Sequence, residues 1–239
     1  MKKPIIGMIC PRNIDINSPF KNYTKFVNTY GKRIMEAGGI PIGIIFPDGF
    51  KEEQVEMCDG FLFQGGSIIE SSQISTIHYA IIKDKPIFGI CLGMQTMAGY
   101  NWLYKKLNGN LTYQKIEKNF KPEDEEYFLK KKEGHDKLNP FYLSKIESSK
   151  HCVIFDKESN LYKIYGENSY FPSIHNFIVK EDIFNNSHLF KVTGKSPDGV
   201  IEAIEGIKSD NFIVGVQFHP ELEDKDLPIF KTFIKKCQK

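Results

Sequence analysis

Short apolar runs alternate with segments of helical spacing along the first half of the chain. The apolar runs predict buried strands over residues 4–9, 40–46, 60–63 and 85–90. Apolar side chains three and four residues apart predict helices over residues 23–37, 51–57, 74–83 and 94–104. Strands that are apolar on both faces, each followed by a helix, are typical of a parallel sheet covered on both sides.

The second half of the chain has a different pattern. Residues 115–137 are rich in Lys, Glu and Asp with little periodicity, which predicts an exposed connection. Shorter apolar runs then predict added antiparallel strands over residues 152–155, 177–179, 189–192, 200–205 and 212–218, with a turn at 208–210 and a closing helix over 227–237. We therefore predict one domain, residues 1–239, folded as a three-layer α/β/α sandwich with a mostly parallel central sheet and extra antiparallel strands.

Composition excludes several classes of protein. The chain has 239 residues, of which 41% are hydrophobic and 26% charged, as in soluble globular proteins. A formal net charge of +2 is too small to indicate nucleic acid or a membrane as partner. The first apolar run is too short for a signal peptide, and no run approaches the roughly 18 apolar residues of a membrane span. We expect a soluble, cytoplasmic protein.

The cysteines and histidines show no ligand spacing. The five cysteines are odd in number and widely separated, which disfavours a disulfide framework or a zinc site. Five histidines have no partners at ligand spacing, and we interpret them as surface or packing residues: His78, His135, His151, His175 and His188. We therefore expect no metal and no organic cofactor.

The sequence Gly-Ile-Cys-Leu-Gly at residues 89–93 places Cys91 between two glycines, after a buried strand and before a helix. This is the nucleophile-elbow pattern with cysteine in place of serine. The helix dipole favours the reactive thiolate, and the amide of Leu92 is positioned to bind an oxyanion. A buried cysteine in a tight turn gives the same pattern, so the pentapeptide alone leaves both interpretations open.

Two further features fit a cysteine nucleophile. His219 ends a predicted strand and Glu221 follows it, as a base and the group that orients it require. Gly65 and Gly66 end another strand at the sheet edge expected to hold Cys91, where a glycine amide can supply a second oxyanion donor. Taken singly, His219 could be a packing residue and the glycine pair an ordinary turn.

In their order along the chain, these three motifs resemble the class I glutamine amidotransferases, which have a flavodoxin-like fold. The resemblance implies a Cys91–His219–Glu221 triad. It also implies an oxyanion hole formed by Gly66 and Leu92, and contacts to the glutamyl part of the substrate from Gln95 and Gly65.

Within that superfamily the chain is most similar to the γ-glutamyl-γ-aminobutyrate hydrolase type, peptidase family C26. The likeness is carried by residues 3–7, 37–41, 59–60 and 196–205, the last reading Ser-Pro-Asp-Gly-Val-Ile-Glu-Ala-Ile-Glu. It implies cysteine-dependent hydrolysis of a small γ-glutamyl compound through a glutamyl thioester, without a cofactor. A homodimer is left open.

The chain departs from that pattern at two places. Residues 67–72 are short and lack arginine, and residues 168–172 lack the usual histidines. We expect these segments to bind the leaving group, so the released amine should differ from γ-aminobutyrate. Exposed loops that never touch the substrate are the alternative interpretation of both segments. Two other functions stay open: a glutaminase subunit delivering ammonia to a synthase, and a non-catalytic binding protein of the same fold.

Overall fold

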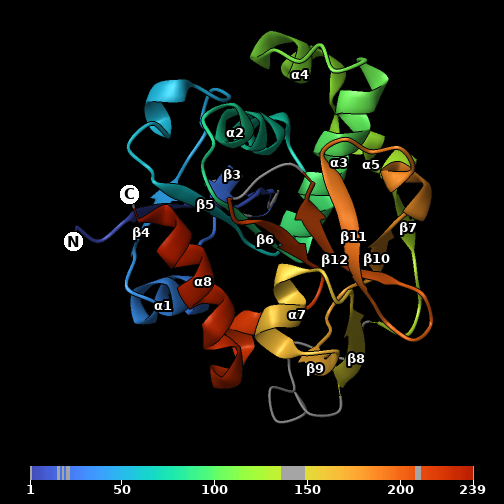
Figure 1. Cartoon of the computed structure of the whole chain (residues 1–239). Helices are drawn as coiled ribbons and strands as arrows, with labels where there is room; N and C mark the ends of the chain where they lie inside the picture. Colours follow the sequence, from blue (N-terminus) through green and yellow to red (C-terminus); the bar gives the residue numbers. More distant parts are fainter. Residues whose placement is uncertain are drawn as a thin grey trace.

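The computed structural model describes residues 2–14, 17, 19, 22–135, 149–207 and 211–238. Its centre is a sheet of nine strands among the described residues, in the order β4-β1-β5-β6-β13-β12-β11-β8-β9 (Figure 1). The first five strands of that order are parallel: β4 (Ile40–Ile44), β1 (Ile5–Ile9), β5 (Gly60–Phe63), β6 (Ile87–Ile90) and β13 (Ile213–Val216). Along the chain this order reads 2-1-3-4-5, as in flavodoxin-like folds.

The remaining four strands extend the sheet by antiparallel pairing, which confirms the predicted extension in part. These four strands are β12 (Ile201–Gly206), β11 (Phe190–Lys195), β8 (Lys150–Phe155) and β9 (Asn168–Pro172). Two of the runs predicted to belong to the extension do not: residues 212–218 contain β13, which is parallel to β6, and residues 177–179 pair outside this sheet. The pattern of apolar runs gave no sign of β9 as a strand, nor of the short helix α7 (Asn160–Tyr165) that precedes it.

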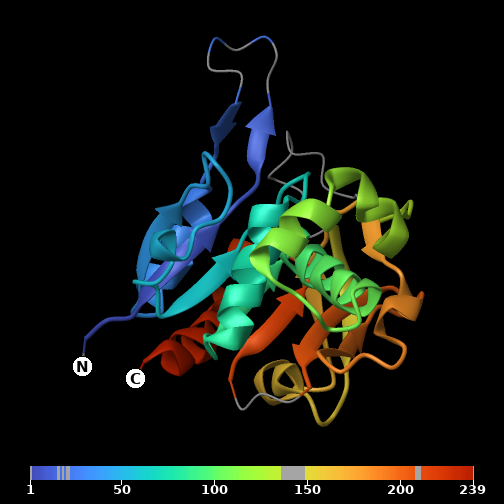
Figure 2. The same cartoon turned by 90° about the horizontal axis from the view of Figure 1, so that it is seen from above.

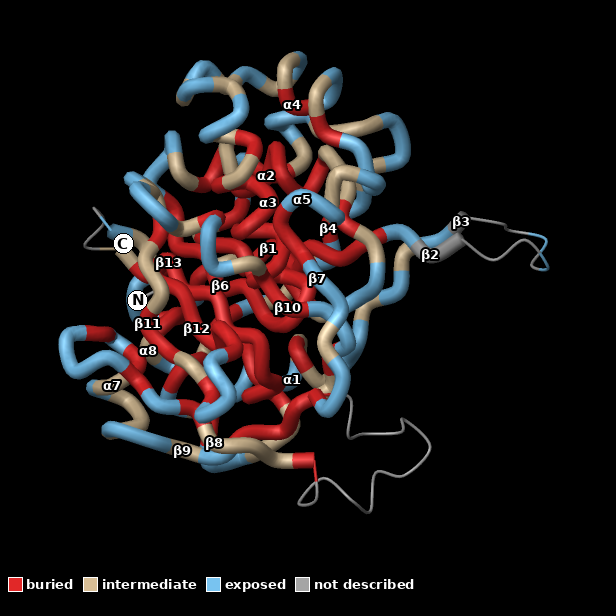
Figure 3. The backbone as a smooth tube through the Cα atoms, turned by 90° about the vertical axis from the view of Figure 1, so that its right-hand side faces the viewer, coloured by how far each residue is buried: buried red, intermediate tan, exposed pale blue. Residues whose placement is uncertain are grey.

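Helices cover both faces of the sheet. One face packs against α1 (Asn28–Glu36), α7 and α8 (Leu227–Cys237), and the other against α2 (Ser71–Ile82), α3 (Leu92–Lys106), α4 (Tyr113–Asn119) and α5 (Glu125–Phe128). Successive strand residues alternate between the two cores: Phe61 faces α2 and α3, whereas Leu62 faces α1 and α8. The central strands are buried and the outer connections exposed (Figure 3), which confirms the predicted three layers.

The predicted helix over residues 23–37 begins too early, because α1 starts at Asn28. β3 (Asn22–Thr24) pairs instead with β2 (Arg12–Ile14) in a hairpin that projects from the molecule (Figure 2). The side chain of Gln64 holds the next residues extended: it accepts from the Val27 amide at 3.2 Å and donates to the Lys25 carbonyl at 2.9 Å. This tertiary contact overrides the local helical pattern.

The prediction of an exposed connection over residues 115–137 is also wrong where the structure describes it. The segment forms most of α4, then α5 and β7 (Leu129–Lys131), which pairs with β10 (Phe177–Val179). Phe120 and Phe128 are fully buried beside Trp102. Residues 136 and 137, like the predicted turn at 208–210, lie outside the described residues. Among the described helices, none combines the length and apolar character that a membrane span requires.

Two glycines allow α3 to approach the sheet closely. A Cβ on Gly93 would lie 2.3 Å from the carbonyl oxygen of Phe63 in β5. A Cβ on Gly89 would lie 2.7 Å from the carbonyl carbon and oxygen of Gly93. Both obstacles are backbone atoms, which cannot rotate away, so only glycine permits this strand–helix turn.

We expect Gly93→Ala to lower the free energy of unfolding by more than about 2 kcal/mol, because the added methyl group overpacks a backbone contact. Gly31→Ala in α1 is the matched control, since its Cβ would meet nothing closer than 3.7 Å. Alanine should there raise stability by up to about 1 kcal/mol through helix propensity. Urea unfolding of both variants tests this, and equal stabilities would contradict the packing argument.

Candidate active site

Three neighbouring parallel strands, β5, β6 and β13, deliver the predicted motifs to one edge of the sheet. Gly65 follows β5, Cys91 follows β6 and His219 comes three residues after β13. A Cβ placed on Gly65 would lie 3.2 Å from His219 Cε1 and 3.6 Å from Cys91 Cβ. The structure therefore brings together three features that the sequence spreads over residues 65–219.

Cys91 occupies a strained turn. Its φ of 54° and ψ of −106° place a non-glycine residue at positive φ, immediately before α3. The backbone is held on both sides, because the Cys91 amide donates to the Val216 carbonyl at 2.8 Å and the Gln95 amide donates to the Cys91 carbonyl at 3.2 Å. This is the geometry expected of a nucleophile elbow.

His219 forms a short hydrogen bond with Glu221, 2.6 Å from Nδ1 to Oε1. Both side chains are buried, and Nε2 has no hydrogen-bond partner among the described residues. Burial alone would lower the pKa of His219, but the charges of Glu221 and Cys91 outweigh it and raise that pKa well above its usual value. The site therefore favours the imidazolium, with Nδ1–H directed to Glu221.

Two side chains of α1 that the sequence did not single out as functional support this pair. Arg33 is buried and donates from Nε to the backbone carbonyl of Glu221 at 3.0 Å, while its Nη1 binds Asp224 at 2.7 Å. The Tyr30 hydroxyl accepts from the Gly65 amide at 3.2 Å. Burial, with the nearby Glu221 charge, raises the pKa of Tyr30 well above its usual value. The sequence signal that could have identified Arg33 was its position, because it is a charged residue within the apolar face of the predicted helix.

Gly66 and Leu92 lie side by side next to Cys91. A Cβ on Gly66 would lie 2.5 Å from Pro11 Cγ and 3.1 Å from Leu92 Cδ2, so only glycine fits. Leu92 is the first residue of α3, and its amide has no partner within the helix. Together with Cys91 they line a cleft of about 200 Å³.

Gln95 lines the same cleft and belongs to a buried amide network. Its Nε2 donates to the Phe177 carbonyl at 3.0 Å and to Gln217 Oε1 at 3.1 Å. Gln217 Nε2 in turn lies 3.6 Å from Cys91 Sγ. Sequence reasoning missed Gln217, although a glutamine inside an apolar strand was a visible signal. Gly65 lies outside the cleft lining in the described part of the chain.

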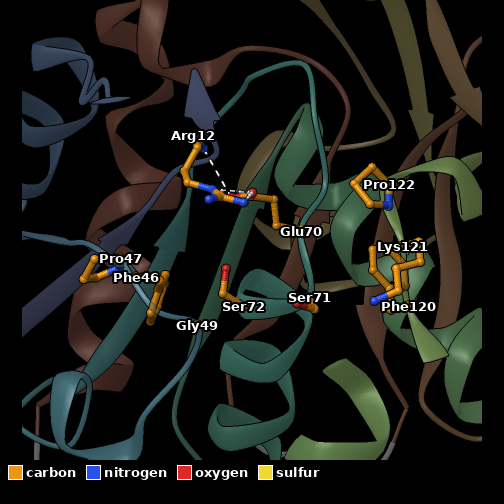
Figure 4. A pocket seen from close by; sticks show the side chains of 10 residues that line it. All are labelled: Arg12, Phe46, Pro47, Gly49, Glu70, Ser71, Ser72, Phe120, Lys121 and Pro122. Carbon is orange, nitrogen blue, oxygen red and sulfur yellow. Dashed lines mark hydrogen bonds and ion pairs between the residues drawn. The ribbon is translucent and has the colours of Figure 1, made fainter. Parts of the chain in front are cut away.

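The segments expected to bind a leaving group are placed differently from each other. Ser67 lines the Cys91 cleft, whereas Glu70, Ser71 and Ser72 line a separate hollow in which Glu70 pairs with Arg12 (Figure 4). Residues 168–172 form β9, where Phe171 stacks on the ring of Phe218. Within the described residues, this strand takes no part in lining the cleft.

The far wall of the cleft comes from two segments that carried no sequence signal. Glu125 and Leu129 contribute from α5 and β7, and residues 174–177 contribute from the connection between β9 and β10 and the first residue of β10. Glu125 accepts from the Ile69 amide at 2.7 Å, and burial raises the pKa of its carboxyl.

The prediction that five histidines are isolated surface or packing residues is wrong for three of them. His135, His151 and His175 converge on the buried carboxylate of Glu202, with one ligand atom from each residue within 4.8 Å of the others. His78 instead contacts Tyr100, and His188 is exposed.

Comparison with known proteins gives a family match and relatives over most of the chain. The family described as Peptidase C26 matches residues 69–221, more than half of the chain. A Rickettsia prowazekii protein described as glutamine amidotransferase-like is 28% identical over 98% of both chains. The CTP synthase of Paramagnetospirillum magneticum is 28% identical over 80% of this chain but only 37% of its own length.

Solved structures show the same fold at lower identity. The CTPS glutaminase domain of Trypanosoma brucei, solved with bound acivicin, has a TM-score of 0.65 at 15% identity, covering 98% of this chain and 94% of that one. A Thermoplasma acidophilum protein described as a GMP synthase subunit has a TM-score of 0.61 at 17% identity, with coverages of 99% and 95%. From the family match and these relatives, the chain belongs to the Peptidase C26 family, within the class I glutamine amidotransferase-like superfamily.

Proposed function

We propose that the chain hydrolyses the γ-glutamyl amide bond of a small compound, with Cys91 as nucleophile, His219 as base and Glu221 orienting the imidazole. One observation carries this proposal: the Cys91 elbow and the His219–Glu221 pair, bonded at 2.6 Å, meet at adjacent strand ends. Membership of the Peptidase C26 family supports an amide-hydrolysing enzyme.

The proposed reaction has two halves. The Cys91 thiolate attacks the γ-carbonyl carbon, and the amides of Gly66 and Leu92 stabilise the resulting oxyanion. His219 gives its Nε2 proton to the departing amine, which leaves a glutamyl thioester. His219 then takes a proton from water, whose oxygen attacks the thioester and releases glutamate and the Cys91 thiolate.

The leaving amine is proposed to lack a carboxylate. The described residues that line the cleft include Glu125 but no lysine or arginine. A carboxylate on the leaving group would meet a like charge there, without a cation to pair with it. The position of Glu125 therefore supports the proposal that the leaving-group pocket is altered. Residues 168–172 give this proposal no support, since none of them lines the cleft.

A glutaminase function that delivers ammonia to a synthase is the second candidate. It is favoured by the likeness to CTP synthases, of which the chain spans about 37% of the length. Under this candidate free glutamine would be the best substrate, and its hydrolysis would increase when a synthase partner is added.

We expect His219→Ala to lower kcat/KM by about 10⁴-fold or more, because the proton carrier is lost. Glu221→Gln should cause a loss roughly ten to a hundred times smaller, since Glu221 orients the ring and transfers no proton. His188→Ala, at an exposed histidine, is the control. Equal losses for His219→Ala and Glu221→Gln in folded proteins would contradict the assigned roles.

We expect kcat/KM for an uncharged γ-glutamyl alkylamide to exceed that for γ-glutamyl-γ-aminobutyrate by about tenfold, the effect of about 1.4 kcal/mol of like-charge repulsion. Glu125→Gln should bring the two kcat/KM values closer together, because it removes the charge from the cleft wall. Free glutamine is included in the panel. A preference for the aminobutyrate compound would contradict the cleft argument, and a preference for glutamine would favour the ammonia-delivering glutaminase.

A further inference from the structure

A second constellation lies one strand away from the Cys91 site. The histidine–glutamate cluster consists of His135, His151, His175 and Glu202. Its members come from four separate parts of the chain: the turn after β7, strand β8, the β9–β10 connection and strand β12. The backbone amide of Gln217, next to β13, donates to the Glu202 carbonyl at 2.8 Å, which ties the two sites together.

All three imidazoles face one carboxylate oxygen. Glu202 Oε1 lies 3.5 Å from His135 Nδ1, 3.1 Å from His151 Nε2 and 3.6 Å from His175 Nε2. Glu202 is 0% exposed, and the three ring nitrogens and both of its carboxylate oxygens are buried without a hydrogen-bond partner among the described residues. Buried polar atoms left unpaired in this way are costly, and four of them converge on one point.

Contacts to the other ring nitrogens fix the orientation of two imidazoles. His175 Nδ1 lies 3.2 Å from the Phe177 carbonyl, and His135 Nε2 lies 3.1 Å from Asp198 Oδ2. Since a carbonyl and a carboxylate only accept hydrogen bonds, these nitrogens carry the protons. In the neutral rings, His175 Nε2 and His135 Nδ1 then direct lone pairs at the carboxylate of Glu202, which is repulsive unless a cation lies between them.

Protonating the rings would replace one unfavourable arrangement with another. The ring centroid of His135 lies 4.9 Å from that of His175 and 5.0 Å from that of His151. A proton on His135 would pair with both Glu202 and Asp198. It would, however, leave the Nε2 lone pair of His175 facing the Glu202 carboxylate. A second or third imidazolium would be crowded against the first. A divalent cation satisfies all four ligand atoms at once, and the contacts on the far side of His135 and His175 are those that orient metal-binding histidines.

We propose that the histidine–glutamate cluster is a structural binding site for one divalent transition-metal ion, for which Zn²⁺ is the best fit. Three imidazoles and a carboxylate are a ligand set that zinc accepts, and four protein ligands make a closed site. Ligands about 2.0 Å from a tetrahedral zinc are about 3.3 Å apart. The three distances from Glu202 to the histidines, 3.1, 3.5 and 3.6 Å, are close to this value, and all four ligand atoms lie within 4.8 Å of one another.

The position of the site gives the ion a role in the neighbouring cleft. His175 belongs to the segment of residues 174–177 that forms one cleft wall, and the Phe177 carbonyl accepts from Gln95. The His175 amide also donates to the His135 carbonyl at 3.2 Å. An ion held by the cluster would fasten this wall to β8 and β12, and so fix the surface facing Cys91.

The experiment uses the full chain without an affinity tag of histidines. We expect elemental analysis of the purified protein to give about one zinc per chain, and Co²⁺ added to the chelator-stripped protein to give the visible absorption of tetrahedral cobalt. Free Zn²⁺ at 100 times its Kd should raise Tm by roughly 5–10 °C. Hydrogen exchange of peptides covering residues 172–179 should slow when Zn²⁺ binds.

Glu202→Gln and His151→Ala should each lose the metal and the tetrahedral cobalt spectrum, while His78→Ala and His188→Ala should retain both. If the cluster variants fail to fold, the titrations of the stripped wild-type protein decide alone. A wild-type protein that neither retains metal nor shows the tetrahedral cobalt spectrum, and whose Tm does not respond to Zn²⁺, would overturn the proposal. These measurements do not depend on which amide the Cys91 site hydrolyses.

Discussion

The close approach of α3 to the sheet is the constraint on which the rest of the site depends. Because Gly89 and Gly93 have no side chains, the helix begins against the backbone of β5 and β6. The chain must then reverse within one residue, and that residue is Cys91, at a φ of 54°. The strain cannot relax locally, since the packed helix and strands hold the turn from both ends.

This placement brings a buried, hydrogen-bonded pair of charged side chains close to the cysteine. His219 and Glu221 reach it from β13, the strand next to β6, and both are buried. A hydrogen-bonded ion pair away from water interacts more strongly than one at the surface, and it costs little to reorganise during a reaction. From α1, Arg33 donates to the Glu221 carbonyl and the Tyr30 hydroxyl accepts from the Gly65 amide, so helices on both faces of the sheet contribute to one edge.

Much of this arrangement could be read from the sequence, because it depends on local signals. Apolar runs predicted the strands, and the glycine pair, Cys91 and His219 lie at strand ends, where a parallel sheet brings them together. What failed depends on tertiary contacts. The Gln64 side chain holds residues 25–27 extended, and Phe128 is buried within a charged segment. The histidine–glutamate cluster combines residues up to 67 positions apart, so no ligand spacing could reveal it.

The most direct test of the account is the site of alkylation by a glutamine-like chloroketone, located by peptide mass spectrometry. We expect a single adduct on Cys91. Cys10 and Cys58 are built-in controls, since burial raises the pKa of their thiols to about 12 and about 11 and leaves them unreactive. An adduct on Cys10 or Cys58, together with undiminished hydrolysis by Cys91→Ala, would contradict the claim that Cys91 is the nucleophile.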